Sequence, residues 1–194
     1  MPAFDAPACL DLACGTGDLA FRLASRYPAG HVLGLDLTPD MIERARARRP
    51  SPRVRFEIGD LGRTGLPDAS FDVVTGGYAL RNAGDLDEAI AEVFRLLKPG
   101  GAAAFLDFSK PPNAWIQRMN GRLLKCWGGI WGLALHRNPD VYGYIADSLD
   151  RFPDRVELAQ RISAAGLVVT GARRHFGGVL ESVWLRKPGG ARSA

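Results

Sequence analysis

The stretch Leu-Asp-Leu-Ala-Cys-Gly-Thr-Gly-Asp-Leu-Ala, residues 10–20, decides the fold, because an apolar strand runs there into a glycine turn and then into an amphipathic helix. Gly15 and Gly17 lack the Cβ atoms that would hinder a sharp turn, and they let a ligand approach the backbone. The following helix directs its free N–H groups at the same place. This stretch therefore predicts a nucleotide-binding turn in an α/β fold.

Two further acids follow the next predicted strands. Asp36 ends the second strand about 20 residues after the glycines, where a carboxylate can accept hydrogen bonds from both ribose hydroxyls. Because Gly15, Gly17 and Ala20 also satisfy the relaxed dinucleotide fingerprint, the turn alone does not distinguish NAD from other nucleotides. Asp60 follows the third strand and is placed to meet an adenine amine. Together the glycine turn, Asp36 and Asp60 favour S-adenosylmethionine as the ligand.

Length and charge bound the possible functions. With 194 residues, 46% of them hydrophobic, the chain can bury one core, so we expect a single domain over residues 1–194. The net charge of +4 is modest and the arginines are scattered, which argues against a nucleic-acid partner and leaves an anionic membrane surface open.

Three cysteines without metal-ligand spacing indicate reduced, mostly buried thiols, no metal site and a cytoplasmic protein. No uncharged stretch reaches the roughly 20 residues that span a bilayer.

The rest of the chain alternates predicted strands and helices, which is typical of a parallel sheet covered by helices. Strands are expected at residues 8–13, 31–36, 54–58, 71–75, 102–108, 167–170 and 179–185. Helices are expected from the glycine turn to Pro28 and over residues 39–49, 85–97, 113–135 and 153–165. The last two strands predict an antiparallel hairpin at one edge of the sheet.

Residues 113–135 depart from this alternation. Trp115, Trp127 and Trp131 fall on one helical face, and basic side chains lie largely on another. A helix packed on the core is one interpretation. A cover helix that faces substrate or lipid headgroups is the other, since tryptophan beside basic residues suits a membrane interface.

Five segments of the chain, at residues 10–20, 34–39, 79–82, 97–101 and 108–111, together resemble the ubiquinone/menaquinone biosynthesis C-methyltransferases. The first two are shared widely among class I methyltransferases. The Leu-Arg-Asn and Phe-Ser-Lys-Pro pieces, in the third and fifth segments, are far more specific to the quinone group. The resemblance covers nearly the whole chain.

The resemblance implies a Rossmann-like class I methyltransferase fold, with a seven-stranded, mostly parallel sheet and helices on both faces. It implies methyl transfer from S-adenosylmethionine to a ring carbon of a prenylated quinol, namely demethylmenaquinol or a related benzoquinol. The family usually has several dozen residues ahead of the first strand, so we expect this chain to lack the usual N-terminal helical extension.

The resemblance carries cofactor contacts over to Thr16, Asp36, Asp60 and Leu61. A serine often found before the aromatic residue of the fourth motif is Gly77 here. With neighbouring residues of the same turns, the expected cofactor-binding set is Asp11, Gly15, Thr16, Gly17, Asp18, Asp36, Leu37, Asp60, Leu61, Gly77 and Tyr78.

Arg81 and Asn82 are the candidate catalytic residues. A ring carbon is a poor nucleophile until a neighbouring phenol loses its proton, and a guanidinium can hold the resulting oxyanion by paired hydrogen bonds. The alternative for Arg81 is a structural ion pair with Asp85 or Asp87. Asn82 is expected to orient the ring or a water that takes the final proton. His136 is a further candidate for a general base.

Two other functions stay open. One is a methyltransferase of the same fold that acts on an unrelated small metabolite. The other is a non-catalytic partner subunit that binds the cofactor.

Overall fold

The computed structural model describes residues 4–110, 148–149 and 151–189. The helix expected at residues 113–135, with its tryptophans, lies outside these residues, as do Cys126 and His136. None of the helices within the described ranges combines the length and the apolar composition that a membrane crossing requires.

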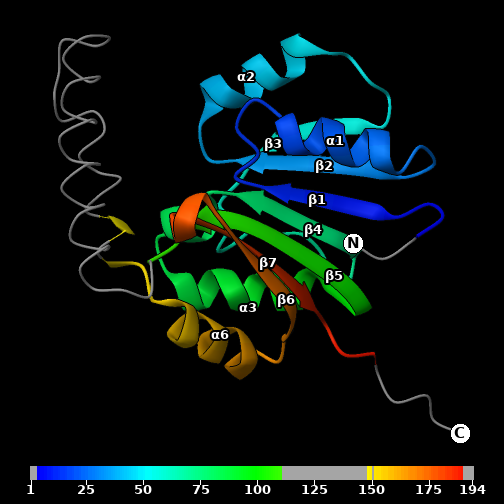
Figure 1. Ribbon diagram of the computed structural model, residues 1–194. Coiled ribbons are helices and arrows are strands. Elements are labelled where there is room, and N and C mark those ends of the chain that lie inside the picture. Colours follow the sequence, from blue (N-terminus) through cyan, green and yellow to red (C-terminus); the bar gives the residue numbers. More distant parts are fainter. Residues whose placement is uncertain (1–3, 111–147, 150, 190–194) are drawn as a thin grey trace, which may run out of the picture.

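Seven strands form one sheet in the order β3-β2-β1-β4-β5-β7-β6 (Figure 1). Their bounds are β1 Ala8–Leu12, β2 His31–Asp36, β3 Val54–Ile58, β4 Phe71–Gly77, β5 Leu97–Phe108, β6 Val168–His175 and β7 Leu180–Arg186. Neighbouring strands are parallel except at β7, which is antiparallel to both β5 and β6. The Rossmann-like fold and the antiparallel hairpin are therefore confirmed.

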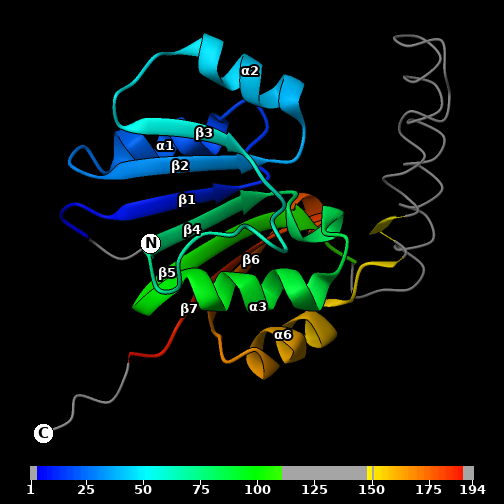
Figure 2. The ribbon, with the colours of Figure 1, turned by 180° about the vertical axis from the view of Figure 1, so that it is seen from behind.

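Helices cover both faces of the sheet (Figures 1 and 2). On one face lie α1 (Asp18–Arg26) and α2 (Pro39–Arg48), and on the other lie α3 (Leu86–Leu96) and α6 (Arg155–Ala164). The carboxylates of Asp85 and Asp154 cap α3 and α6 by accepting backbone N–H bonds from the first turn of each helix. Pro39 is the first residue of α2, as the sequence predicts.

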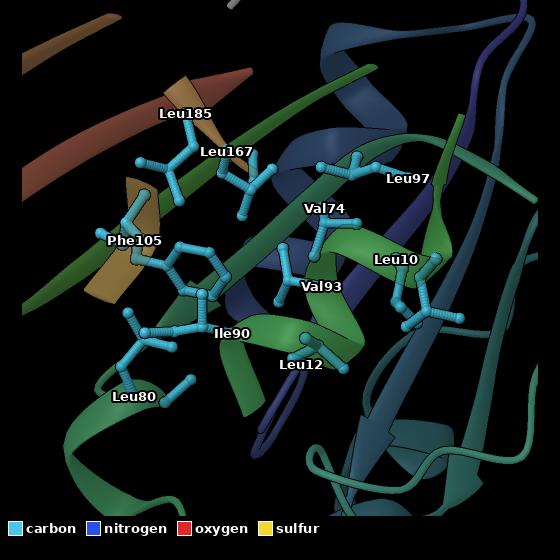
Figure 3. Close-up of a cluster of buried hydrophobic side chains, with 14 of the residues drawn as sticks. Leu10, Leu12, Val74, Leu80, Ile90, Val93, Leu97, Phe105, Leu167 and Leu185 are labelled. Atoms are coloured by element: carbon cyan, nitrogen blue, oxygen red, sulfur yellow. The ribbon is translucent and has the colours of Figure 1, made fainter. Parts of the chain in front are cut away.

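The alternation of side chains in β1 separates two apolar cores. Cys9 and Asp11 face the α1 side of the sheet, where Cys9 packs with buried side chains of both α1 and α2. Leu10 and Leu12 face the other side, together with buried residues of α3, β4 and β5 (Figure 3). The predicted burial of Cys9 and Cys14 is confirmed, and burial raises the pKa of each thiol to about 12.

Three strands are longer than predicted: β4 continues to Gly77, and β5 and β6 are longer by more. β5 begins at Leu97, because Leu97 pairs with Phe71 and the backbone of Lys187 bonds both Gly100 and Gly101, so the segment that looks like a helix stop stays in the sheet. β6 continues to His175, because β7 pairs with it as far as that residue. The last residues of β6 are polar, so the sequence there lacks the apolar pattern that predicts a strand.

Candidate active site

The glycine turn after β1 is a cradle of left-handed backbone. Residues Ala13, Gly15 and Gly17 have φ of 50°, 53° and 86°. A Cβ at Gly17 would lie 2.6 Å from the Phe56 ring, whereas a Cβ at Gly15 would meet no atom within 4 Å. Gly17 is therefore required for the turn to pack against β3, and Gly15 leaves open space beside the backbone.

Asp36 fixes this turn from the end of β2. Its Oδ2 accepts the Gly15 N–H at 2.8 Å, and its Oδ1 accepts the Thr38 N–H at 2.9 Å. Each carboxylate oxygen can accept a second bond, and the group is only half-buried. Asp36 thus combines a structural role with the acceptor capacity expected of a ribose-binding acid.

Asp11 is a buried carboxylate on the α1 face of β1. Its Oδ1 accepts the Thr75 hydroxyl at 2.7 Å, while its Oδ2 makes no hydrogen bond to a described residue. Burial raises the pKa of Asp11 to about 7, although the Thr75 hydroxyl and the Ala20 amide act in the opposite direction. An unsatisfied buried acceptor is costly, so this oxygen is suited to a cationic donor.

The other residues expected to bind the cofactor lie in more open positions. Leu37 is 68% exposed, and the carboxylate of Asp60 accepts the Gly62 N–H at 2.8 Å in the turn that contains Leu61. Asp18 lies in the first turn of α1, and its carboxylate forms an exposed 2.6 Å ion pair with Arg48.

Thr16 is linked to the same arginine. Its backbone carbonyl accepts a bond from the Arg48 guanidinium at 3.3 Å. Arg48 of α2 thus joins the glycine turn to the second helix.

Gly77 and Tyr78 form a corner at the end of β4. Tyr78 has φ of 57°, and its N–H donates to the carbonyl of Leu106 at 2.7 Å. Its half-exposed ring packs at 5.3 Å between centroids against Phe108. A Cβ at Gly77 would lie 3.3 Å from the side chain of Leu19, so a larger residue there would require a small shift of Leu19.

Arg81 is deeply buried and forms a structural ion pair, the alternative interpretation of this residue, but its partner is Asp107 in place of Asp85 or Asp87. Its side chain is 2% exposed, and that of Asp107 is 8% exposed. The Nε lies 3.4 Å from Asp107 Oδ1, and the backbone N–H donates to Asp107 Oδ2 at 3.0 Å. The guanidinium also donates to the Ser148 hydroxyl and lies 5.1 Å from the centre of the Phe108 ring.

Asn82 is exposed beside this buried pair. Its amide nitrogen donates to the carbonyl of Tyr78 at 2.8 Å, which ties the short 3-10 helix η1 (Leu80–Asn82) to the corner after β4. Because that bond uses the nitrogen, the carbonyl oxygen of the side chain can still accept a hydrogen bond.

Arg81 and Asn82 border one cavity of about 510 Å³. It is lined by Leu80, Arg81, Asn82, Ala83, Gly84, Leu86, Ser148, Arg151, Phe152 and Pro153. The structure therefore brings the two candidate catalytic residues to the wall of one space, at the end of the sheet that also carries the glycine turn.

Sequence reasoning missed Asp107 and Thr75, the partners of Arg81 and Asp11. Asp107 is a carboxylate near the end of an otherwise apolar strand, directly before the Phe-Ser-Lys-Pro segment. That position was a usable signal, because a charge in a buried strand needs a partner. Thr75 gives no comparable signal, since threonine is common in strands.

The profile of the family described as "ubiE/COQ5 methyltransferase family" matches residues 3–187. A 2-phytyl-1,4-naphtoquinone methyltransferase from Nostoc punctiforme is 38% identical, over 80% of this chain and 71% of its own length. The ubiquinone/menaquinone biosynthesis C-methyltransferase UbiE of Dinoroseobacter shibae is 37% identical, over 81% and 64%. A demethylmenaquinone methyltransferase from Thermus thermophilus is 36% identical, over 87% and 77%.

Solved structures are similar in fold. An S-adenosylmethionine-dependent methyltransferase from Mesorhizobium loti has a TM-score of 0.70 at 19% identity, over 96% of this chain and 93% of its own. The [4+2]-cyclase SpnF has a TM-score of 0.71 at 21% identity, over 96% and 76%. At these identities the likeness establishes the fold, and a cyclase among the neighbours shows that the fold alone does not fix the reaction.

Proposed function

Because the chain belongs to the ubiE/COQ5 methyltransferase family, we propose that it transfers a methyl group from S-adenosylmethionine to a ring carbon of a prenylated quinol. Membership confirms a methyltransferase, and S-adenosylmethionine is the methyl donor in this proposal. The observation that carries the substrate class is that relatives at 36–38% identity are named for phytyl-naphthoquinone and demethylmenaquinone.

The residues around the glycine turn fit this donor. Asp11 offers a buried, unsatisfied acceptor for an ammonium group, and Asp36 offers acceptors for ribose hydroxyls. Gly15 leaves its backbone open to a ligand, and the exposed Leu37 offers an apolar surface for adenine. When bound, S-adenosylmethionine supplies an electrophilic methyl group.

We assign the activation of the ring to Arg81. Arg81 borders the 510 Å³ cavity, so the positive charge of its guanidinium, although the side chain is almost fully buried, would stabilise the phenolate of a quinol ring bound there. Asp107 and Ser148 hold that guanidinium in one orientation. Asn82 presents a carbonyl oxygen that can accept a hydrogen bond from a ring hydroxyl or from a water that removes the ring proton.

Peripheral contact with an anionic membrane is part of the proposal, because a prenylated quinol resides in lipid. Phe176 is 81% exposed and lies in the turn after β6, at the same edge of the sheet as the site. The side chain of Arg173, three residues earlier, is also exposed. An exposed aromatic side chain near a basic one suits the headgroup region of a bilayer.

The experiment measures transfer of labelled methyl from S-adenosylmethionine to demethylmenaquinol, a demethylated benzoquinol and a water-soluble catechol. We expect transfer to a quinol and a loss of about 100-fold in kcat for Arg81→Gln, the order found when one oxyanion donor is removed. Arg22→Gln, at an exposed site on α1, is the matched control and should leave kcat unchanged. Transfer to the catechol alone would favour a small-metabolite methyltransferase instead.

A further inference from the structure

A second cavity lies between α6 and the strands β5, β6 and β7. Its volume is about 230 Å³. Most of its wall is apolar and consists of Leu80, Phe105, Phe108, Phe152, Pro153, Leu158, Ala159, Ile162, Val169, Ala172 and Val183. Ligand sites in proteins are concave and mostly apolar, so this space is a candidate for binding an apolar group.

The charged groups in the wall of this cavity are compensated within the protein. Both oxygens of Asp107 accept backbone N–H bonds, and the Arg81 guanidinium lies beside them. Glu181 Oε1 makes no hydrogen bond to a described residue, but it lies 3.1 Å from Arg155 Nε and 4.0 Å from Arg174 Nε, so its charge is paired. The wall is therefore balanced in charge and mostly apolar, and the fitting occupant is a neutral, largely hydrocarbon group.

The cavity adjoins the site around Arg81. Leu80, Phe152 and Pro153 line both this cavity and the 510 Å³ cavity that contains Arg81 and Asn82. The two cavities are therefore neighbours with a common wall, and an apolar substituent on a ring beside Arg81 would lie close to the smaller cavity. At about 230 Å³ the cavity is smaller than the roughly 300–1,000 Å³ that encloses a whole drug-sized ligand, so it suits one branch of a molecule.

We propose that this cavity binds the first units of the isoprenoid chain of the quinol, and the inference rests on the function proposed above. If the isoprenoid chain lies in this cavity, the cavity is the part of the site that distinguishes a prenylated ring from a bare one. Each methylene buried there raises affinity about fourfold. A chain that fills the cavity therefore dominates the preference for substrate.

The test fills the cavity from α6. Ala159→Phe places a ring in the space, and Ala164→Phe, at an exposed position of the same helix, is the matched control. Methyl transfer is measured with a demethylated quinol that bears an isoprenoid chain and with the same quinol bearing none. For Ala159→Phe we expect KM to rise at least tenfold for the chain-bearing quinol and to stay unchanged for the chainless one.

A second measurement does not depend on catalysis. Farnesol, which has an isoprenoid chain and no ring, is titrated into wild-type protein and both variants by calorimetry. We expect saturable binding to the wild type and to Ala164→Phe, and at least tenfold weaker binding to Ala159→Phe. Val183→Phe fills the cavity from β7 and replaces Ala159→Phe if thermal unfolding shows that the latter does not fold.

The outcomes separate the two proposals. Equal rises in KM for both quinols, or farnesol binding that the cavity-filling variant leaves unchanged, would overturn the assignment of the cavity. Farnesol binding that Ala159→Phe weakens, in a protein that methylates neither quinol, would keep the chain site and reject the proposed reaction.

Discussion

Asp11→Asn tests how the buried carboxylate under α1 links stability to pH. The pKa of Asp11 is about 7 in the folded protein and about 3.9 in an unfolded chain, a difference of about 3 units. Because the folded value is the higher one, the favourable contribution is present at acid pH and is lost as pH rises from about 4 to about 7. At 1.36 kcal/mol per unit, the wild type loses about 4 kcal/mol of unfolding free energy over this range.

Asparagine has nearly the same shape and cannot ionise. The unfolding free energy of Asp11→Asn should therefore lack this loss and exceed that of the wild type by up to about 4 kcal/mol at pH 8. The assay is urea unfolding of both proteins between pH 4 and 8, and the difference between them cancels groups that titrate in both. Thr75→Val, which removes the hydroxyl partner, should raise the pKa of Asp11 further and extend the loss to higher pH.

The affinity for S-adenosylmethionine should rise with pH, whereas the unfolding free energy falls. A cationic ligand requires the ionised carboxylate, so affinity for S-adenosylmethionine by calorimetry should fall about tenfold per unit as pH drops below 7 in the wild type. Asp11→Asn should bind weakly at every pH. A stability difference between the two proteins that stays constant from pH 4 to 8 would refute the account of Asp11 as a neutral buried acid.

Three further predictions concern other parts of the site. Asp36→Ala removes the acceptor of the Gly15 N–H, so affinity for S-adenosylmethionine should fall at least tenfold by calorimetry; unchanged affinity would exclude Asp36 from the cofactor site. Asp107→Ala removes the carboxylate that faces the buried Arg81, so unfolding in urea should show a loss of about 3–5 kcal/mol, and a loss under 1 kcal/mol would contradict the buried pair. Phe176→Ser should reduce flotation with vesicles that contain phosphatidylglycerol at low salt, and equal flotation of both proteins would remove this side chain from the membrane contact.

The local sequence predicts the order of most elements and several of their ends. It predicts the full length of each strand less reliably. Pro39 starts α2 where a proline at the first helical position is expected, and Asp36 ends β2. β5 was predicted five residues too short because its first part contains proline and two glycines. The structure keeps that part extended through backbone bonds to Lys187, which is more than 80 residues away in the chain.

The amino-acid sequence alone predicts the glycine turn, the acids at the strand ends and the α/β class, and its resemblance to a family indicates the methyl donor. Each of these depends on neighbouring residues and on the repeat of strands and helices, which the chain displays directly. Only the tertiary structure decided that Arg81 faces Asp107, that Asp11 keeps an unsatisfied oxygen beside Thr75, and that a cavity lies under α6. Arg81 and Asp107 are 26 positions apart in the chain, and Asp11 and Thr75 are 64 positions apart. Contacts between such distant residues depend on strand register and on which face of the sheet each side chain occupies.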